Sequence, residues 1–242
     1  MAADEHYLKY FANFNRHGNL WRYMERARFE QLLSSSALWF SGADRFDDAF
    51  EGSISDATRQ VVKYPSDVSQ DQIAQFERGH LWWREWTNIS CWHYAEHENA
   101  LMWQAYAKTG IAIRTTFAKL SSELPERAMI SPVMYKDFSR EIVPEGNYIR
   151  YLVKRHFFSP EREVRAILIN APPNEQGTED FALRNTKGGV SVRVELSRMV
   201  DAVVARPYAS PAEITELRAL VTRSGFTLPT LPSALSGEPR WV

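Results

Sequence analysis

The sequence predicts a single α+β domain with a mixed, mostly antiparallel sheet and peripheral helices. Short segments that alternate apolar and polar residues, as half-buried strands do, recur along the chain. Helical patterns separate only some of them, which favours an α+β fold over a regular α/β fold. The 242 residues suffice for one domain with a sizeable core, and 44% hydrophobic and 24% charged residues are ordinary values for a globular protein.

The N-terminal half contains three expected strands, at residues 20–24, 37–41 and 88–93. Between the first two, Phe29, Leu32 and Leu33 repeat at the spacing of one helix face. Residues 66–86 are mostly polar with a helical pattern, and we expect a helix there that could be an insertion over a cleft.

Two pairs of signals mark the middle of the chain. Asn99 is a suitable N-cap for a helix that reaches about residue 108, and Gly110 follows its end. Strands are expected afterwards at residues 111–117, 133–135 and 163–169. Tyr148, Tyr151 and Leu152 have the spacing of a helix face, and Pro160 is expected to stop that helix.

The C-terminal part begins with expected strands at residues 190–196 and 200–205. Ser210 and Glu213 form a capping box with Pro211 at the first helical position, and Gly225 marks the end of the helix. We expect residues 226–242, which contain three prolines, to form an irregular tail.

Composition excludes several classes of protein. The single cysteine, Cys91, rules out an intrachain disulfide and a cysteine-based metal site. A net charge of −1 lacks the basic excess typical of nonspecific nucleic-acid binding. No signal peptide is visible, and no stretch approaches the roughly 18 apolar residues of a membrane span. We therefore expect a cytoplasmic protein that does not contact a membrane.

Metal binding is not expected. His93 and His97 are four residues apart, but His93 ends an expected strand and no third ligand follows at a typical distance. An acidic loop lacks the spacing of an EF-hand and is expected to be solvated or to cap a helix. Its members are Asp44, Asp47, Asp48 and Glu51.

Glu161 and Glu163 are the candidate catalytic carboxylates. They lead into an expected strand at positions i and i+2, which point to the same side. Two close carboxylates repel each other, which raises one pKa and provides an acid or a base. The alternative is a pair of surface glutamates in ion pairs with Arg162 and Arg165.

Aromatic residues gather in the first half of the chain, where seven of the eight tryptophans lie between Trp21 and Trp103. Such a cluster suggests a binding cleft as well as a core, because a tryptophan ring is large and its N–H needs a partner. For any single one of them the core remains the alternative.

Several segments together resemble a widespread uncharacterised bacterial domain family. The resemblance covers most of the chain and brings no established activity. The segments that carry it are residues 38–41, 46–51, 91–93, 101–107, 110–113 and 161–165, which include Leu-Trp-Phe-Ser, Cys-Trp-His, Leu-Met-Trp and Glu-Arg-Glu-Val-Arg motifs.

A second resemblance is to ADP-ribosyltransferases. Arg22 in a short aromatic strand, a serine-bearing strand with Ser41 or Ser90, and then Glu161-x-Glu163 follow the Arg–Ser–Glu order of those enzymes. The resemblance implies an ADP-ribosyltransferase-like fold whose sheet is split around a cleft. It also implies NAD as the substrate, with no metal.

The same resemblance implies roles for the site residues. Glu163 would stabilise the positive charge that builds on the ribose, and Glu161 would orient or deprotonate the acceptor. Arg22 would bind the pyrophosphate. The other candidates would support the glutamate or stack on the rings of NAD, and they are Tyr23, Ser41, Ser90, Trp92, His93 and Trp103.

Three functions stay open at this point. The first is an NAD-dependent transferase that modifies a protein or a nucleic acid, as a toxin or phage-defence effector would, with a neutralising antitoxin as its partner. The second is a non-catalytic module that binds a nucleotide or peptide in an aromatic cleft. The third is a metal-dependent hydrolase or nuclease built on the acidic loop and the histidines.

Overall fold

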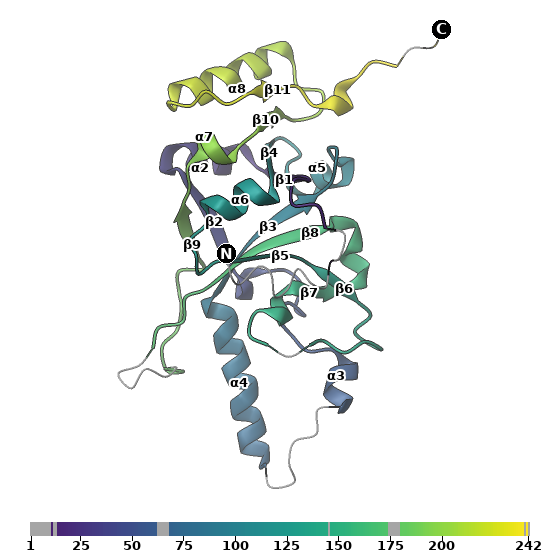
Figure 1. Ribbon diagram of the computed structural model, residues 1–242, viewed down its shortest axis with the longest axis vertical. Coiled ribbons are helices and arrows are strands. Elements are labelled where there is room, and N and C mark those ends of the chain that lie inside the picture. Colours follow the sequence, from purple (N-terminus) through teal and green to yellow (C-terminus); the bar gives the residue numbers. More distant parts are fainter. Residues whose placement is uncertain are drawn as a thin grey trace. The chain divides into compact units, whose positions relative to one another are not determined.

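The computed structural model describes residues 11, 14–61, 68–144, 146–173, 180–239 and 241 (Figure 1). Internal contacts divide the chain into two compact units. The first unit includes Trp39–Cys91 and Glu126–Ser191 where these are described. The second unit combines three stretches of chain, which are Asn13–Leu38, Trp92–Pro125 and Val192–Val242, again where described.

Four strands form the sheet of the second unit together with the end of β3 (Thr87–Tyr94), which pairs with β1. β1 (Asn19–Met24) pairs antiparallel with β4 (Ile111–Thr116) along its whole length. β10 (Ala202–Ala205) pairs antiparallel with β4 on the other side, and β11 (Thr230–Leu231) pairs parallel with β10. The expected strands at residues 20–24, 111–117 and 200–205 are therefore confirmed, except that Phe117 already begins a helix.

The helices of the second unit begin where the sequence predicts them in two cases. Asn99 caps α5 (Ala100–Tyr106) with its side-chain oxygen, and Ser210 with Glu213 forms the capping box of α8 (Pro211–Arg223). In α2 (Arg26–Ser35) the face predicted from Phe29, Leu32 and Leu33 is buried. The helices α6 (Phe117–Glu123) and α7 (Leu196–Met199) complete the unit, with η4 (Ala234–Ser236) near its end.

Gly110 is where the chain approaches a neighbouring strand most closely. A Cβ atom at this position would overlap the carbonyl oxygen of Met24 and lie 2.8 Å from its carbon, both of them backbone atoms of β1. Gly110→Ala is therefore expected to lower the free energy of unfolding by about 2 kcal/mol, in the range of overpacked sites. Urea denaturation would measure this loss.

The control for this prediction is Gly225→Ala. Gly225 has a φ of 86° but nothing lies within 4 Å of a Cβ atom there, so its cost is backbone strain alone. A Gly110→Ala variant no less stable than Gly225→Ala would contradict the close approach.

The first unit contains the rest of the main sheet. β2 (Ala37–Gly42) pairs antiparallel with β3 (Thr87–Tyr94) through residues 41–42 and 88–89. β8 (Glu163–Ile169) pairs antiparallel with β5 (Met129–Pro132) and also pairs with β3. A second sheet of two parallel strands consists of β6 (Met134–Lys136) and β7 (Val153–Arg155).

With β9 (Gly189–Arg193), nine strands form one mixed, mostly antiparallel sheet. Its main order is β11-β10-β4-β1-β3-β2-β9, while β8 joins β3 and β5 joins β8. The chain is thus an α+β domain with peripheral helices, as the sequence predicts. None of the described helices is long and apolar enough to cross a membrane.

Three helical elements of the first unit lie before β3, and only the last of them is long. α4 (Gln70–Trp86) confirms the helix predicted at residues 66–86, and it begins at a capping box formed by Ser69 and Gln72. Residues 66 and 67 lie outside the described residues. α3 (Asp56–Val61) and the short η1 (Ala43–Arg45) precede it and were not predicted.

The helix predicted from residue 148 to Pro160 is wrong. The chain forms a 3₁₀ turn η2 (Ile149–Leu152), then strand β7, then a second 3₁₀ helix η3 (His156–Glu161). Tyr148, Tyr151 and Leu152 keep their common face because a 3₁₀ turn also brings i and i+3 together. Strand pairing between β7 and β6 replaces the expected helix after residue 152.

The tail predicted at residues 226–242 is also partly wrong. β11 and η4 are regular elements within it, and residues 240 and 242 lie outside the described part. Leu228, Thr230 and Ser233 are buried, so this segment packs on the second unit instead of running over it. Paired backbone in β11 satisfies the polar groups that such burial would otherwise leave without partners.

Candidate functional site

Five charged side chains of the first unit meet in one buried group, which we call the charge cluster. Glu163 and Arg165 come from β8, where positions i and i+2 face the same side. Lys154 comes from β7, Glu161 from the end of η3, and Glu51 from the loop after η1. Strands and turns far apart in sequence therefore place these side chains together.

Arg165 is the centre of the charge cluster and is fully buried. Its guanidinium donates to both oxygens of Glu51, at 2.6 and 3.0 Å, and to Oε2 of Glu163 at 2.5 Å. Nη1 also donates to the carbonyl oxygen of Tyr151 at 2.7 Å. Because its charge is compensated by two carboxylates, Arg165 can stay ionised without contact with water.

Lys154 links the two candidate carboxylates. Its Nζ donates to Oε1 of Glu163 at 2.7 Å and makes a short ion pair with Oε2 of Glu161. The same ammonium lies 4.5 Å from the ring centre of Phe158, a cation–π contact. The two glutamates thus lie side by side at one cation, as their spacing predicts, and they are not the solvated surface pair of the alternative reading.

The charge cluster holds an odd number of charges. Three carboxylates face two cations, so full ionisation would leave one negative charge in excess. A proton on one carboxyl removes that excess at a lower cost than a buried unpaired charge. The cluster therefore provides a site for one exchangeable proton.

Glu161 is the carboxyl that holds this proton. Burial, and then the adjacent Glu163, raise the pKa of Glu161 to about 7, although Lys154 opposes the shift. Its side chain is also the more open of the two, at 18% exposed against 7% for Glu163. A carboxyl that exchanges a proton near neutral pH suits general acid–base chemistry.

Glu163 stays ionised in the same surroundings. Burial works against its charge, but Arg165, the hydrogen bond shared with Glu161, and Lys154 outweigh burial and hold the pKa of Glu163 well below its usual range. Each of its oxygens accepts from a cation. Its backbone N–H donates to the hydroxyl of Tyr135 at 2.7 Å.

Cys91 lies near the charge cluster but is not a nucleophile there. Burial, and then the negative charge of Glu163, raise the pKa of its thiol far above the usual value. Because the thiolate is the reactive form, a thiol held protonated is inert.

The predicted site residues fall into two groups. Glu161, Glu163, Ser41 and Ser90 belong to the first unit. The charge cluster brings the two glutamates together, and Ser90 is fully buried in β3. The second unit contains Arg22, Tyr23, Trp92, His93 and Trp103. A pocket shared by Arg22 and Glu163 stays a prediction.

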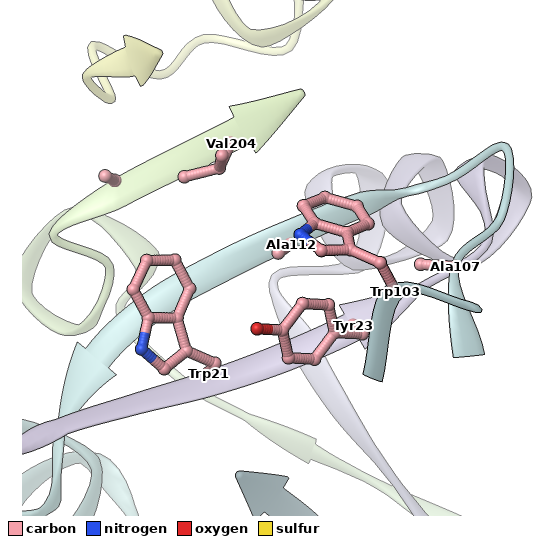
Figure 2. Packing of buried hydrophobic residues seen from close by; sticks show 7 residues of the cluster. Trp21, Tyr23, Trp103, Ala107, Ala112 and Val204 are labelled. Atoms are coloured by element: carbon pink, nitrogen blue, oxygen red, sulfur yellow. The ribbon is translucent and has the colours of Figure 1, made fainter. Parts of the chain in front are cut away.

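The aromatic candidates of the second unit are buried and pack against each other. Figure 2 shows Trp21 and Tyr23 on one strand, with Trp103 close to the Tyr23 ring. The Tyr23 and Trp103 rings meet edge to face, with centres 5.1 Å apart. These side chains form the core of this unit with Ala107, Ala112, Ala202 and Val204.

The polar atoms of these aromatic residues have partners. The Tyr23 hydroxyl accepts from the backbone N–H of Asn99 at 2.9 Å, and burial raises its pKa to about 12. Trp103 Nε1 donates to Glu98 at 2.9 Å, and the same carboxylate accepts from Ser233 and Ala234. These side chains are therefore part of the hydrophobic core of the second unit.

Two further candidates also have contacts inside the second unit. The guanidinium of Arg22 lies 5.6 Å from the ring centre of Trp92, which is buried. His93 Nε2 lies 3.3 Å from the side-chain nitrogen of Asn99 and is buried as well. A buried ring with a hydrogen-bonding partner is the usual state of a core histidine.

The acidic loop is solvated only in part. Asp47 is exposed, whereas Glu51 is buried against Arg165 and Asp48 accepts from Arg155 at 2.8 Å. Within the described part of the chain, no group of three or more histidine, cysteine, aspartate or glutamate side chains is arranged to hold a metal ion.

Glu51, Lys154 and Arg165 were not selected as site residues from the sequence, although the alternative named Arg165 as an ion-pair partner of the glutamates, and its pair with Glu163 is confirmed. One signal was available for Arg165, because it interrupts the apolar strand Val164–Ile169 where a charge needs a buried partner. For Glu51 no local signal existed, since it lies 114 residues from Arg165.

Comparison with known proteins adds no relative: no model of a protein family matches the chain, and no curated protein is significantly similar to it. Two of the segments that resemble the uncharacterised bacterial domain family nevertheless contribute to the same site. Residues 46–51 contribute Glu51, and residues 161–165 contribute Glu161, Glu163 and Arg165, to the charge cluster.

Proposed function

We propose that this chain is an ADP-ribosyltransferase-like enzyme that uses NAD to modify a protein or nucleic-acid acceptor, with Glu161 as its proton-transferring carboxyl. The observation that supports this proposal is the odd charge of the cluster, which leaves Glu161 able to exchange a proton near pH 7 beside a permanently ionised carboxylate. The assignment of NAD as the substrate rests on the resemblance of the Arg–Ser–Glu order to that of ADP-ribosyltransferases.

The reaction assigns the proton transfer to Glu161. The bond between the ribose carbon and the nicotinamide nitrogen breaks, and positive charge develops on the ribose. The acceptor forms the new bond to that carbon and gives up a proton, which the Glu161 carboxylate takes. Nicotinamide leaves with the electron pair of the broken bond, so atoms and charges balance.

This assignment keeps the role that the resemblance implies for Glu161 and changes that of Glu163. Both oxygens of Glu163 already accept from cations, at 2.7 Å from Lys154 and 2.5 Å from Arg165. Glu163 therefore acts through its fixed negative charge, which raises the proton affinity of Glu161. Glu161 is the group that contacts the reacting molecules.

The rest of the proposal follows the resemblance. Its fold would be a sheet split around a cleft, as in ADP-ribosyltransferases, and Arg22 would bind the pyrophosphate of NAD. Activity of this kind in a toxin or phage-defence effector would require a neutralising partner in the host cell. No metal takes part in the proposed step.

Glu161→Gln is expected to lower nicotinamide release from NAD by about 100-fold, the lower end of the contribution of a general base. The amide keeps the size of the side chain and can still accept from Lys154, so the charge cluster keeps its remaining ion pairs. Nicotinamide released by the purified protein would be quantified by liquid chromatography at pH 7.5.

The matched control is Glu238→Gln, which makes the same chemical change at an exposed position. It is expected to release nicotinamide at the wild-type rate. Equal rates for wild type and Glu161→Gln would refute the role of Glu161. Absence of release by the wild type, with and without cell extract as a source of acceptor, would refute the proposed activity.

A further inference from the structure

A separate pocket lies on the first unit between α4 and residues 181–184, with a volume of about 350 Å³. That volume falls at the small end of the range found for ligand sites, about 300–1,000 Å³. It shares no residue with the charge cluster.

Three contacts fix residues 181–185 against α4 (Figure 1). Trp82 Nε1 donates to the carbonyl oxygen of Leu183 at 2.7 Å. Arg184 makes a two-point ion pair with Glu85, and the Asn185 side chain donates to the Glu85 carbonyl oxygen at 2.7 Å. One wall of the pocket is therefore held in place by polar contacts from the last turns of the helix.

The rest of the lining that the argument uses is apolar and partly exposed. Gly79 leaves room for the ring of Phe181, which lies 3.6 Å from the position of an added Cβ atom. That ring meets Trp82 edge to face, with centres 5.1 Å apart. Phe181 is 51% and Leu81 is 59% exposed, so two large apolar side chains still present surface that a ligand could cover.

The charges around the pocket sum to a positive value. Arg184 and Glu85 cancel, and the hydrogen bond from Arg184 lowers the pKa of Glu85, which keeps that carboxylate ionised. Arg78 also lines the pocket and has no ion-pair partner among the described residues. One net positive charge beside an apolar, aromatic wall favours an anion with an apolar body.

We propose that this pocket binds a small planar molecule that has one acidic group, with its ring against Phe181 and Leu81 and its acid at Arg78. The contribution of each part can be separated. The ring gains apolar burial, whereas the acid gains a charge-assisted hydrogen bond.

Two dyes of almost the same shape test both parts. 8-Anilinonaphthalene-1-sulfonate has a planar naphthalene ring with one sulfonate and an anilino group, and N-phenyl-1-naphthylamine has the same aromatic body without the charge. The sulfonate dye is expected to bind the native protein at one site, with an increase in its own fluorescence. Arg78→Gln is expected to weaken its binding about 10-fold and to leave the uncharged dye unaffected.

Two variants complete the design. Gly79→Leu places a side chain in the pocket and improves helix propensity, so it should block both dyes without loss of folding. Arg59→Gln, an exposed arginine of α3, is the matched control and should bind both dyes as the wild type does.

Sulfonate-dye binding that survives both Arg78→Gln and Gly79→Leu would overturn the proposal, as would equal affinity for the two dyes. Binding that occurs only when the protein is heated or partly denatured would overturn it as well. Because dye binding requires no NAD, its outcome is independent of the activity proposed for Glu161.

Discussion

Arg165→Met is expected to lower the free energy of unfolding by about 3–5 kcal/mol, the usual cost of removing one partner from a buried ion pair. The substitution leaves the carboxylates of Glu51 and Glu163 in the interior, where their side chains are 1% and 7% exposed. Methionine fills much of the volume of arginine, so the loss arises mainly from uncompensated charge.

Urea denaturation followed by tryptophan fluorescence would measure this effect. Arg218→Met is the control, because Arg218 is exposed and makes only 3.4 Å contacts with the Thr230 carbonyl oxygen. Adding Glu51→Leu to Arg165→Met removes one stranded carboxylate and should recover part of the loss. A loss below about 1 kcal/mol for Arg165→Met would mean that the cluster is open to water.

The second large effect is a fall in stability as the pH rises from 5 to 8. The pKa of Glu161 is raised from 4.5 to about 7 in the folded chain. Between these values the folded state holds a proton that the unfolded state has lost, so unfolding becomes easier with increasing pH. A shift of this size corresponds to about 3 kcal/mol across the window.

Other groups of the charge cluster do not obscure this window. Glu163 has a lowered pKa, so its contribution is present above the unfolded value of 4.5 and is lost only as the pH falls below it. Lys154 and Arg165 have raised pKa values and keep their charge throughout. Glu51 meets Arg165 within the cluster, while Tyr135 and Cys91 have raised pKa values and remain neutral.

His80 works in the opposite direction. Burial, and then Arg150, lower its pKa, so its contribution to stability increases with pH. Comparing wild type with Glu161→Gln at each pH removes this term, since the variant keeps His80. The difference between the two proteins should decrease steadily from pH 5 to 8, and a constant difference would contradict the proton on Glu161.

Local sequence signals were sufficient for much of the fold. Alternating residues predicted β4 and β8, short apolar segments predicted β1 and β10, and the caps at Asn99 and Ser210 predicted where α5 and α8 begin. Local signals led to a wrong prediction at residues 148–160, where the spacing of Tyr148 and Tyr151 fits a 3₁₀ turn as well as a helix. Only pairing with β6 decides for a strand at Val153, and that contact is not local.

The candidate site was less accessible from sequence. The two glutamates stood out because their spacing is local, and their shared cation Lys154 is only seven and nine residues away. Glu51 depends on a chain reversal that no nearby residue encodes. The odd charge count, which decides where the proton resides, appears only when all five side chains are considered together.

The second unit has a consequence for synthesis of the protein. Its sheet joins β1, from the first 24 residues, to β10 and β11, which end at residue 231. A ribosome adds residues from the N-terminus, so β1 and β4 are made about 90 residues before β10 and more than 110 before β11, and lack these neighbours during that interval. During that interval the edge of β4 that later pairs with β10 has unpaired backbone N–H and C=O groups, which is the kind of edge that chaperones protect from aggregation.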